Sequence, residues 1–313
     1  MDWNPGSLPA QSGRTIVVTG ATAGIGYFAA EQLASAGAEV VLASRSPAKL
    51  RTAQEAIRAR VPDAQLRSVV IELGSFAAID EAAARLVELP RVDGILLNGA
   101  PMSFSTRART EDGLPMVLGA HALANIRLVA RVLPSMIESA NRNNTVGRVV
   151  HTSTGFVSRF RYDLDDLGKV PWTGVGAYTK AKTATEVFAF ELDRRLKAAG
   201  APVASIVVRP GVGVDAKTPQ RPGIRDATTS YRRNPYTPWA QGKDQAAWPA
   251  VRALTDPDVH GGELLAPAQG LRGEPVSLPP LDRTAHPSAA EAERVWRQLE
   301  ELAAVQLSVP IAR

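Results

Sequence analysis

The strongest constraint on the fold of this chain is a glycine-rich segment between an apolar run and a helix-length pattern. The run Thr15–Thr19 leads into Gly20-Ala21-Thr22-Ala23-Gly24-Ile25-Gly26, and a helical pattern then continues through Ala36. Glycines at a strand-to-helix junction permit a tight turn, let a pyrophosphate approach the main chain and let the helix pack closely on the strand. The helix N-terminus adds N–H groups and partial positive charge. Although tight turns need glycine anyway, this context predicts dinucleotide binding.

Short apolar runs recur along the rest of the chain and alternate with helix-length segments. The runs are Thr15–Thr19, Val40–Ala43, Leu66–Ile71, Gly94–Leu97, Arg148–Thr152, Ser205–Arg209 and Glu263–Ala266. Continuous apolar runs suit strands covered on both faces, and their alternation with helices predicts a parallel sheet. We therefore predict an α/β fold, a Rossmann-type doubly wound parallel sheet of about seven strands with helices on both faces. No linker or repeat divides residues 1–313, which predicts one domain.

Cap residues mark the helices between these runs. The predicted helices are Ala48–Arg60 after Ser46-Pro47, Phe76–Leu89 after Ser75, a helix from near Tyr178 that ends at Gly200 and Pro202, and a C-terminal helix around 288–305 that begins with the capping box Ser288/Glu291. Two Pro-rich stretches interrupt the alternation. We expect 210–250 to be a substrate lid, with a floppy surface loop as the alternative, and 266–287 to be plain packing.

Composition excludes several kinds of site. The chain has no cysteine, so disulfides, thiolate metal ligands and a cysteine nucleophile are excluded. Its four histidines, at 121, 151, 260 and 286, show no metal-ligand spacing, so we expect no metal. The net charge of +5 is scattered, which disfavours nucleic acid. We expect neither a secretory signal nor a membrane span, and therefore a cytoplasmic protein.

The end of the second strand indicates which dinucleotide binds. An acid there would accept hydrogen bonds from a ribose diol and repel a 2′-phosphate. The segment instead reads Leu42-Ala43-Ser44-Arg45-Ser46. The guanidinium of Arg45 is a permanently charged fork suited to phosphate, and the hydroxyl of Ser44 adds a donor. We predict NADP(H) in preference to NAD(H); the alternative is that Arg45 is a solvated residue at a helix start.

A tyrosine and a lysine form a candidate acid–base pair. Tyr178 and Lys182 are four residues apart in a helical pattern and therefore project from one face. A phenol with a pKa near 10 is a poor catalyst at neutral pH, but a neighbouring ammonium and an oxidised nicotinamide favour its phenolate. Tyr178 could then protonate a carbonyl that receives hydride, or deprotonate an alcohol in reverse. Taken alone, such a pair is also common on ordinary helix surfaces.

Together these motifs resemble the short-chain dehydrogenase/reductase family over nearly the whole chain. The further segments that match the family are Asn98-Gly99-Ala100, Ser153-Thr154 and Pro210-Gly211. Segments that match one branch of the family are Ala43-Ser44-Arg45, Thr110-Glu111-Asp112-Gly113-Leu114, Leu133-Pro134, Gly261-Gly262-Glu263 and Ala292-Glu293-Arg294-Val295-Trp296. Within the family the chain looks most like the branch of retinol dehydrogenases and protochlorophyllide reductases. The spacing of 24 positions from Thr154 to Tyr178 also fits this branch.

The resemblance implies a role for each matching position. It makes Tyr178 the general acid/base, Lys182 its partner and a ligand of the nicotinamide ribose, and Thr154, with Ser153 beside it, the hydroxyl that polarises the carbonyl. It places the cofactor against Gly20, Thr22, Ala23, Gly24, Ile25, Gly26, Ser44, Arg45, Glu72, Leu73, Asn98, Gly99, Ala100, Tyr178, Lys182, Pro210 and Gly211. Homodimers or homotetramers occur in the family, although this branch includes monomers.

Three departures from the family pattern leave an alternative open. Gly99 replaces a second asparagine, Thr154 replaces the usual serine, and His121 falls where the family has an asparagine that holds a water beside the lysine. His121 could complete a proton relay or could be structural. The expected function is NADP(H)-dependent hydride transfer between nicotinamide and a carbonyl or alcohol on a small or medium-sized apolar molecule. The alternative is a catalytically weak or inactive NADP(H)-binding sensor or partner protein.

The predicted lid indicates little more about the substrate. It carries cations and aromatic side chains at Lys217, Arg221, Arg225, Tyr231, Arg232, Arg233, Tyr236, Trp239 and Trp248. These side chains could accept an acidic or aromatic compound, or they could simply pack the lid down and face water. An apolar carbonyl or alcohol of small or medium size remains the expected substrate.

Overall fold

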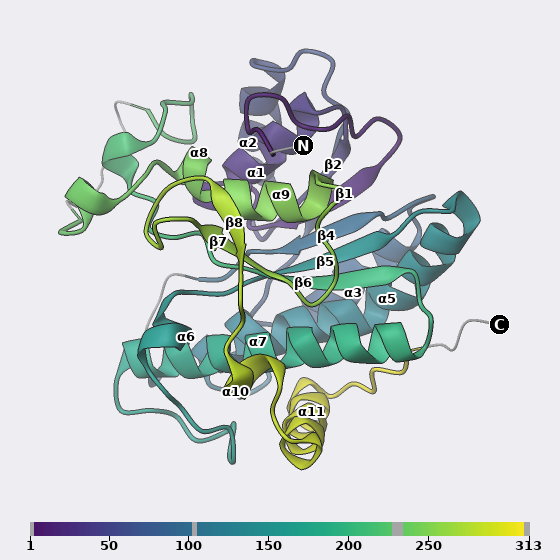
Figure 1. The fold of residues 1–313 in the computed structure, drawn as a ribbon. Helices are drawn as coiled ribbons and strands as arrows, with labels where there is room; N and C mark the ends of the chain where they lie inside the picture. Colours follow the sequence, from purple (N-terminus) through teal and green to yellow (C-terminus); the bar gives the residue numbers. More distant parts are fainter. Residues whose placement is uncertain (1–2, 102–104, 227–233, 310–313) are drawn as a thin grey trace.

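Within residues 3–101, 105–226 and 234–309, which the computed structural model describes, eight strands form one sheet (Figure 1). They are β1 (Thr15–Thr19), β2 (Glu39–Ser44), β3 (Leu66–Val70), β4 (Gly94–Leu97), β5 (Gly147–Thr152), β6 (Val203–Val208), β7 (Leu264–Pro267) and β8 (Pro275–Leu278). Their order is β3-β2-β1-β4-β5-β6-β7-β8. Neighbours from β3 to β7 pair in parallel, and β8 pairs antiparallel with β7. The predicted doubly wound α/β fold is confirmed.

The two edges of the sheet depart from the sequence-based expectation. The predicted number of about seven strands is one too few, because β8 lies inside 266–287, which we expected to be plain packing. A strand that begins with Pro275 and exposes Ser277 has no continuous apolar run, and proline is tolerated at a sheet edge. At the other edge, three of the five residues of β3 are exposed, so this strand is not covered on both faces.

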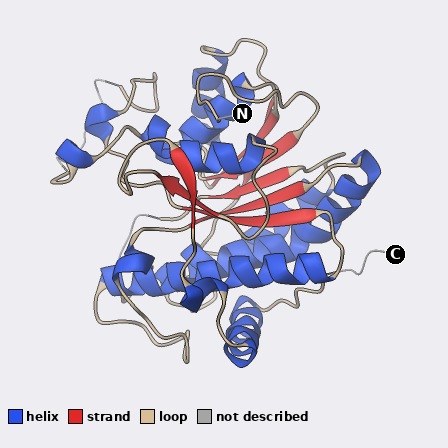
Figure 2. Ribbon diagram, viewed as in Figure 1, coloured by secondary structure: helices blue, strands red, loops and turns tan. Residues whose placement is uncertain are grey.

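Helices cover both faces of the sheet, as the blue layers on either side of the red strands show (Figure 2). The helices α1 (Gly24–Ser35), α2 (Pro47–Arg58) and α9 (Trp248–Thr255) share one core with the sheet. The helices α3 (Phe76–Val87), α5 (Ala124–Asn143) and α7 (Gly174–Ala198) share the other core, and α11 (Ala289–Ala303) packs outside α5 and α7. Shorter pieces are α4 (Met116–Leu118), the π-helical turn η1 (Gly119–Leu123), α6 (Phe156–Arg159), η2 (Asp215–Lys217), η3 (Thr237–Trp239), α8 (Lys243–Ala246) and α10 (Asp282–Ala285).

Two of the three predicted helix caps form as expected. Ser46 accepts a hydrogen bond from the Lys49 N–H at 3.3 Å, and Ser288 forms the full capping box with Glu291. Ser75 occupies the N-cap position of α3, but its side chain makes no cap hydrogen bond. The carboxylate of Asp112 accepts from the Phe76 N–H instead, at 3.0 Å.

One helical stretch has the length and composition of a membrane span. It comprises α4, η1 and α5, from Met116 to Asn143, and 83% of its most apolar window is buried inside the fold. A core helix has the same properties, so this stretch is weak evidence for a membrane. The expected absence of a membrane span stays a prediction.

The sheet topology fixes where a ligand can bind. The chain proceeds outward from β1 to β3 in one direction and from β4 to β7 in the other, so β1 and β4 flank the point where the order reverses. Ligands of open α/β sheets bind outside the carboxyl ends of the strands at such a point. The turn after β1 and the segment after β4 meet there.

Candidate active site

The glycine turn after β1 lies against the turn after β4. Gly20 and Gly24 have φ of +70° and +57°, a region that favours glycine. A Cβ on Gly20 would lie 2.7 Å from the Gly99 Cα, and one on Gly26 would lie 2.4 Å from the Gly20 carbonyl oxygen. Ala23, the N-cap residue of α1, makes no side-chain cap hydrogen bond. The result is a tight turn whose three glycines carry no side chain, and it leads to a helix N-terminus without a side-chain cap. A pyrophosphate fits such a turn and helix N-terminus.

A buried threonine that the sequence analysis missed joins these two turns. The Thr19 hydroxyl accepts hydrogen bonds from the N–H groups of Asn98 (3.0 Å) and Gly99 (2.9 Å), and donates to the Leu96 carbonyl at 3.1 Å. Leu73 packs beneath this contact, 3.2 Å from where a Gly99 Cβ would lie. Thr19 is a polar residue at the end of β1, directly before the glycine turn, and that position was the sequence signal for its role.

The predicted ribose-end residues gather where β2 and β3 end. The hydroxyls of Ser44 and Thr22 are 3.1 Å apart. The Arg45 guanidinium lies 3.9 Å from the Glu72 carboxylate, and their side chains are 71% and 41% exposed. A pair this exposed contributes little stability, so Arg45 is available to a ligand phosphate.

The candidate acid–base residues meet at the N-terminal part of α7. The Tyr178 hydroxyl and the Thr154 side chain form a hydrogen bond. The Lys182 Nζ lies 6.0 Å from the centre of the Tyr178 ring and donates to the Thr152 carbonyl at 2.6 Å. Burial raises the pKa of Tyr178, and the bond with Thr154 opposes this rise. Burial lowers the pKa of Lys182 to about 8, and the charge of Glu186 opposes that shift.

The structure separates the two neighbouring hydroxyls that the sequence analysis named together. Thr154 faces Tyr178, whereas Ser153 is buried and donates to the Glu186 carboxylate at 2.6 Å. Glu186 was not among the predicted site residues, because a glutamate within a long helix carries no sign in the sequence of being buried.

His121 lies against Tyr178 inside the π-helical turn η1. The two ring centres are 5.2 Å apart and the rings meet edge to face. The His121 Nε2 is 3.2 Å from the Pro101 carbonyl oxygen, and its buried Nδ1 has no hydrogen-bond partner among the described residues. Burial, together with the charge of Lys182, lowers the pKa of His121 to about 3. The imidazole is therefore neutral at physiological pH.

The segment after β6 reaches back over the glycine turn. Gly211 has φ of +69°, and a Cβ there would lie 2.5 Å from the Leu271 carbonyl oxygen. Further along, the Lys243 Nζ contacts the Asp215 carboxylate at 2.6 Å, while the Lys243 Cδ passes 3.6 Å from where a Gly24 Cβ would lie. A lysine beside the predicted pyrophosphate position was not foreseen, because 28 residues separate it from Asp215 and no motif marks it.

A buried ion pair attaches the same segment to α1. The Arg221 guanidinium donates to both Glu31 carboxylate oxygens, at 2.6 and 2.8 Å, and the Tyr27 hydroxyl donates to the same carboxylate at 3.0 Å. This part of the predicted lid is therefore fixed to the cofactor-side helix. The predicted lid residues Tyr231, Arg232 and Arg233 lie outside the described residues.

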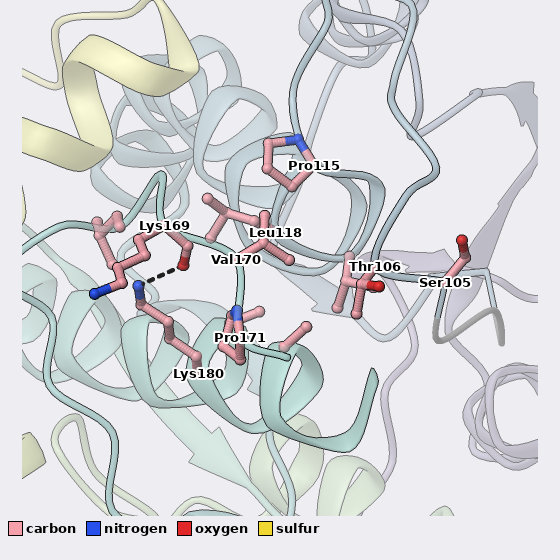
Figure 3. A pocket seen from close by; sticks show the side chains of 12 residues that line it. Ser105, Thr106, Pro115, Leu118, Lys169, Val170, Pro171 and Lys180 are labelled. Atoms are coloured by element: carbon pink, nitrogen blue, oxygen red, sulfur yellow. Dashed lines mark hydrogen bonds between the residues drawn. The ribbon is translucent and has the colours of Figure 1, made fainter. Parts of the chain in front are cut away.

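A small cavity lies beside the candidate site, on a neighbouring face of α7 (Figure 3). Its volume is about 20 Å³, which is enough for one water molecule. Ala177, Lys180 and Ala181 line it from α7, and Lys180 donates to the Lys169 carbonyl at 2.9 Å across it. A cavity of this size cannot hold a substrate.

Comparison with known proteins agrees with this geometry. The family profile described as short chain dehydrogenase matches residues 14–221. The polyprenol dehydrogenase of Mus musculus is 33% identical over 268 residues, 83% of this chain and 77% of the relative. Retinol dehydrogenase 13 of Homo sapiens is 31% identical over 212 residues, 66% of this chain and 62% of the relative.

A solved structure is similar over nearly the full length. The crystal structure of an uncharacterized protein from Mycobacterium paratuberculosis gives a TM-score of 0.76 at 25% identity, covering 99% of this chain and 100% of that one. With the profile match and the two dehydrogenases, this similarity confirms the predicted resemblance. The chain belongs to the short-chain dehydrogenase/reductase family, oxidoreductases that bind a nicotinamide cofactor, and to its retinol dehydrogenase-like branch.

Proposed function

We propose that this protein is an NADP(H)-dependent oxidoreductase that transfers hydride between nicotinamide and a carbonyl or alcohol, with Tyr178 as general acid/base. The hydrogen bond between Tyr178 and Thr154 carries the proposal, because it places a proton donor and a polarising hydroxyl together. Tyr178 and Thr154 lie at the carboxyl edge of the sheet, where the glycine turn after β1 also lies.

The residues of the site have separate tasks in this proposal. Bound NADPH supplies the hydride. Tyr178 donates its proton to the substrate oxygen, and Thr154 donates a hydrogen bond to the same oxygen. Burial raises the pKa of Tyr178, which keeps the phenol protonated for reduction at neutral pH. Lys182 binds the nicotinamide ribose. When the cofactor is bound, the Lys182 ammonium also stabilises the phenolate that forms on Tyr178.

The assay of this role is NADPH oxidation with a panel of aliphatic, isoprenoid and aromatic aldehydes and ketones. We expect Tyr178→Phe to lower kcat about 10²–10⁴-fold while NADPH still binds. Tyr162→Phe, at a half-buried tyrosine outside the predicted lid and the predicted site residues, is the matched control and is expected to match the wild type. Equal turnover by Tyr178→Phe would exclude the proposed acid.

The preference for NADP(H) rests on Arg45. Its exposed guanidinium is available to a 2′-phosphate, and the hydroxyls of Ser44 and Thr22 lie beside it. We expect Arg45→Ala to weaken NADPH binding about tenfold or more and to leave NADH binding nearly unchanged. Arg51→Ala, at an exposed arginine one turn into α2, is the control. Loss of affinity for both nucleotides alike would argue against this role.

The substrate we propose is a small or medium-sized apolar alcohol or carbonyl compound. Phe156 and Phe160 are 38% and 43% exposed, and the Phe156 ring centre lies 6.4 Å from that of Tyr178. These rings offer an apolar surface beside the acid. The relatives named as polyprenol and retinol dehydrogenases carry names of apolar alcohols, in agreement with this class. We further propose that the predicted lid, residues 210–250, covers the substrate.

A non-catalytic NADP(H)-binding sensor is the second candidate, and the neutral His121 favours it. Its buried Nδ1 has no partner among the described residues, so no hydrogen-bonded relay continues from that atom. Tight NADPH binding without turnover of any compound in the panel, unchanged by His121→Asn, would support the sensor.

A further inference from the structure

Four hydrogen bonds converge on one carboxylate about two turns along α7 from the candidate acid. Glu186 is fully buried, 0% exposed, on α7. Its Oε1 accepts from the Ser153 hydroxyl at 2.6 Å and from the Arg209 Nε and Nη2 at 3.0 and 2.7 Å, and its Oε2 accepts from the Arg209 Nη2 at 3.0 Å. Arg209 is itself only 7% exposed.

Each partner of Glu186 adjoins a different part of the site. Ser153 precedes Thr154, and Arg209 precedes the Pro210-Gly211 segment. The Arg209 Nη1 also donates to the Ser158 hydroxyl at 2.6 Å, and Ser158 lies on α6 with Phe156. One carboxylate therefore ties the ends of β5 and β6 to α7, and through Arg209 it also reaches α6.

Glu186 is also the charged neighbour of Lys182. The two residues are one turn apart on α7, and both are buried. The other titratable groups near Lys182 are His121 from η1 and His151 from β5, whose pKa values burial lowers to about 3, and Tyr178 on α7. The neutral histidines contribute no charge at neutral pH, so Glu186 is the carboxylate that opposes the desolvation of the ammonium.

We propose that Glu186 is a positioning residue of the active site, which aligns the Ser153-Thr154 turn and keeps the Lys182 ammonium charged in its buried position. This inference rests on the proposed function. A buried ion pair is weak evidence for stability, because its desolvation costs about as much as its attraction returns. The convergence on elements of one site therefore points to function.

The decisive measurement is the pH dependence of NADPH binding, followed by fluorescence titration between pH 6 and 10. Glu186→Gln keeps the shape of the side chain but removes its charge, so we expect the pH above which NADPH affinity falls to move at least about half a unit lower than in the wild type. At pH 6, where Lys182 is protonated in both proteins, we expect affinities within about threefold of each other.

A second carboxylate on α7 provides the matched control. Glu191 is also buried, at 6% exposed, and is paired with Arg194 and Arg195 away from the candidate site. Glu191→Gln is expected to unfold at lower urea concentration and to keep the wild-type pH profile. If Glu186→Gln also keeps that profile, the proposed effect on Lys182 is wrong.

Two further variants keep the test decisive if Glu186→Gln does not fold. Glu186→Gln/Arg209→Met removes the charge of Arg209 together with that of Glu186, so no unpaired guanidinium is left, and we expect a smaller pH shift in the same direction, because the repulsion of Lys182 by Arg209 is gone. Ser153→Ala keeps the ion pair, so we expect an unshifted pH profile but about tenfold lower kcat with the aldehyde that the wild type reduces fastest. An unchanged kcat in Ser153→Ala would contradict the positioning role.

The outcomes distinguish this inference from the proposed function. If Tyr178→Phe turns over like the wild type, the proposed acid fails whatever Glu186 does. If Tyr178→Phe is inactive while Glu186→Gln keeps the wild-type pH profile of binding, the oxidoreductase stands and only the role of Glu186 is refuted.

Discussion

Replacing Gly26 by alanine is expected to weaken NADPH binding more than it lowers stability. Gly26 lies in the first turn of α1, where an added Cβ would be 2.4 Å from the Gly20 carbonyl oxygen and 2.8 Å from the Asn98 Nδ2. The first contact is with backbone, which cannot rotate away as a flexible side chain can. The helix must therefore move away from the glycine turn.

The two effects differ in size. Overpacking costs about 1–3 kcal/mol of unfolding free energy, and the higher helix propensity of alanine returns about 1 kcal/mol. We expect a net loss of about 0–2 kcal/mol. Displacing the turn from the pyrophosphate removes at least one hydrogen bond to a charged group, worth about 1.5–3 kcal/mol, which corresponds to about 10- to 100-fold weaker binding.

Urea unfolding and fluorescence titration with NADPH measure the two quantities. Gly155→Ala is the matched control, because Gly155 has φ of −62° and a Cβ there would have nothing within 4 Å. We expect this control to bind NADPH as the wild type does and to stay within about 1 kcal/mol of its stability. Wild-type NADPH affinity in Gly26→Ala would refute a pyrophosphate site at this turn.

Three further predictions concern stability, each measured by urea unfolding. Arg221→Met should cost about 1.5–3 kcal/mol, because it leaves the buried Glu31 without its bidentate partner, and it should speed proteolysis of the segment after β6. Trp296→Ala should cost about 3–5 kcal/mol, because Trp296 is 3% exposed and stacks on Phe188 at 5.2 Å. Stability should fall as pH drops from 6.5 toward 3, because His121 is held neutral when folded and takes up a proton on unfolding; His121→Asn should make this fall shallower. An equal pH slope in His121→Asn, or losses under about 0.5 kcal/mol in the other two variants, would contradict these interpretations.

The core strands could be predicted from the sequence, because buried strands consist mostly of apolar residues. β1 and β4 were predicted with their observed bounds, since each is a continuous apolar run between turn signals. The edge strand β8 was not predicted. Its sequence, which includes Pro275 and Ser277, does not favour a strand by itself, and the strand forms because it pairs with β7. Tertiary contact also overrides the cap signal at Ser75, where Asp112, distant in sequence, accepts the free N–H.

The residues of the candidate site likewise fall into those that the sequence predicted and those that it did not. Residues whose roles depend on local geometry were accessible from the sequence, as Tyr178 and Lys182 are through helical spacing and Gly20 is through its turn. Glu186 and Arg209 were not, because 23 residues separate them and each alone resembles an ordinary charged residue. Only the meeting of β5, β6 and α7 makes them a pair. Sequence motifs thus predict the residues that would contact cofactor and substrate. The residues that hold those contacts in position are seen only in the folded structure.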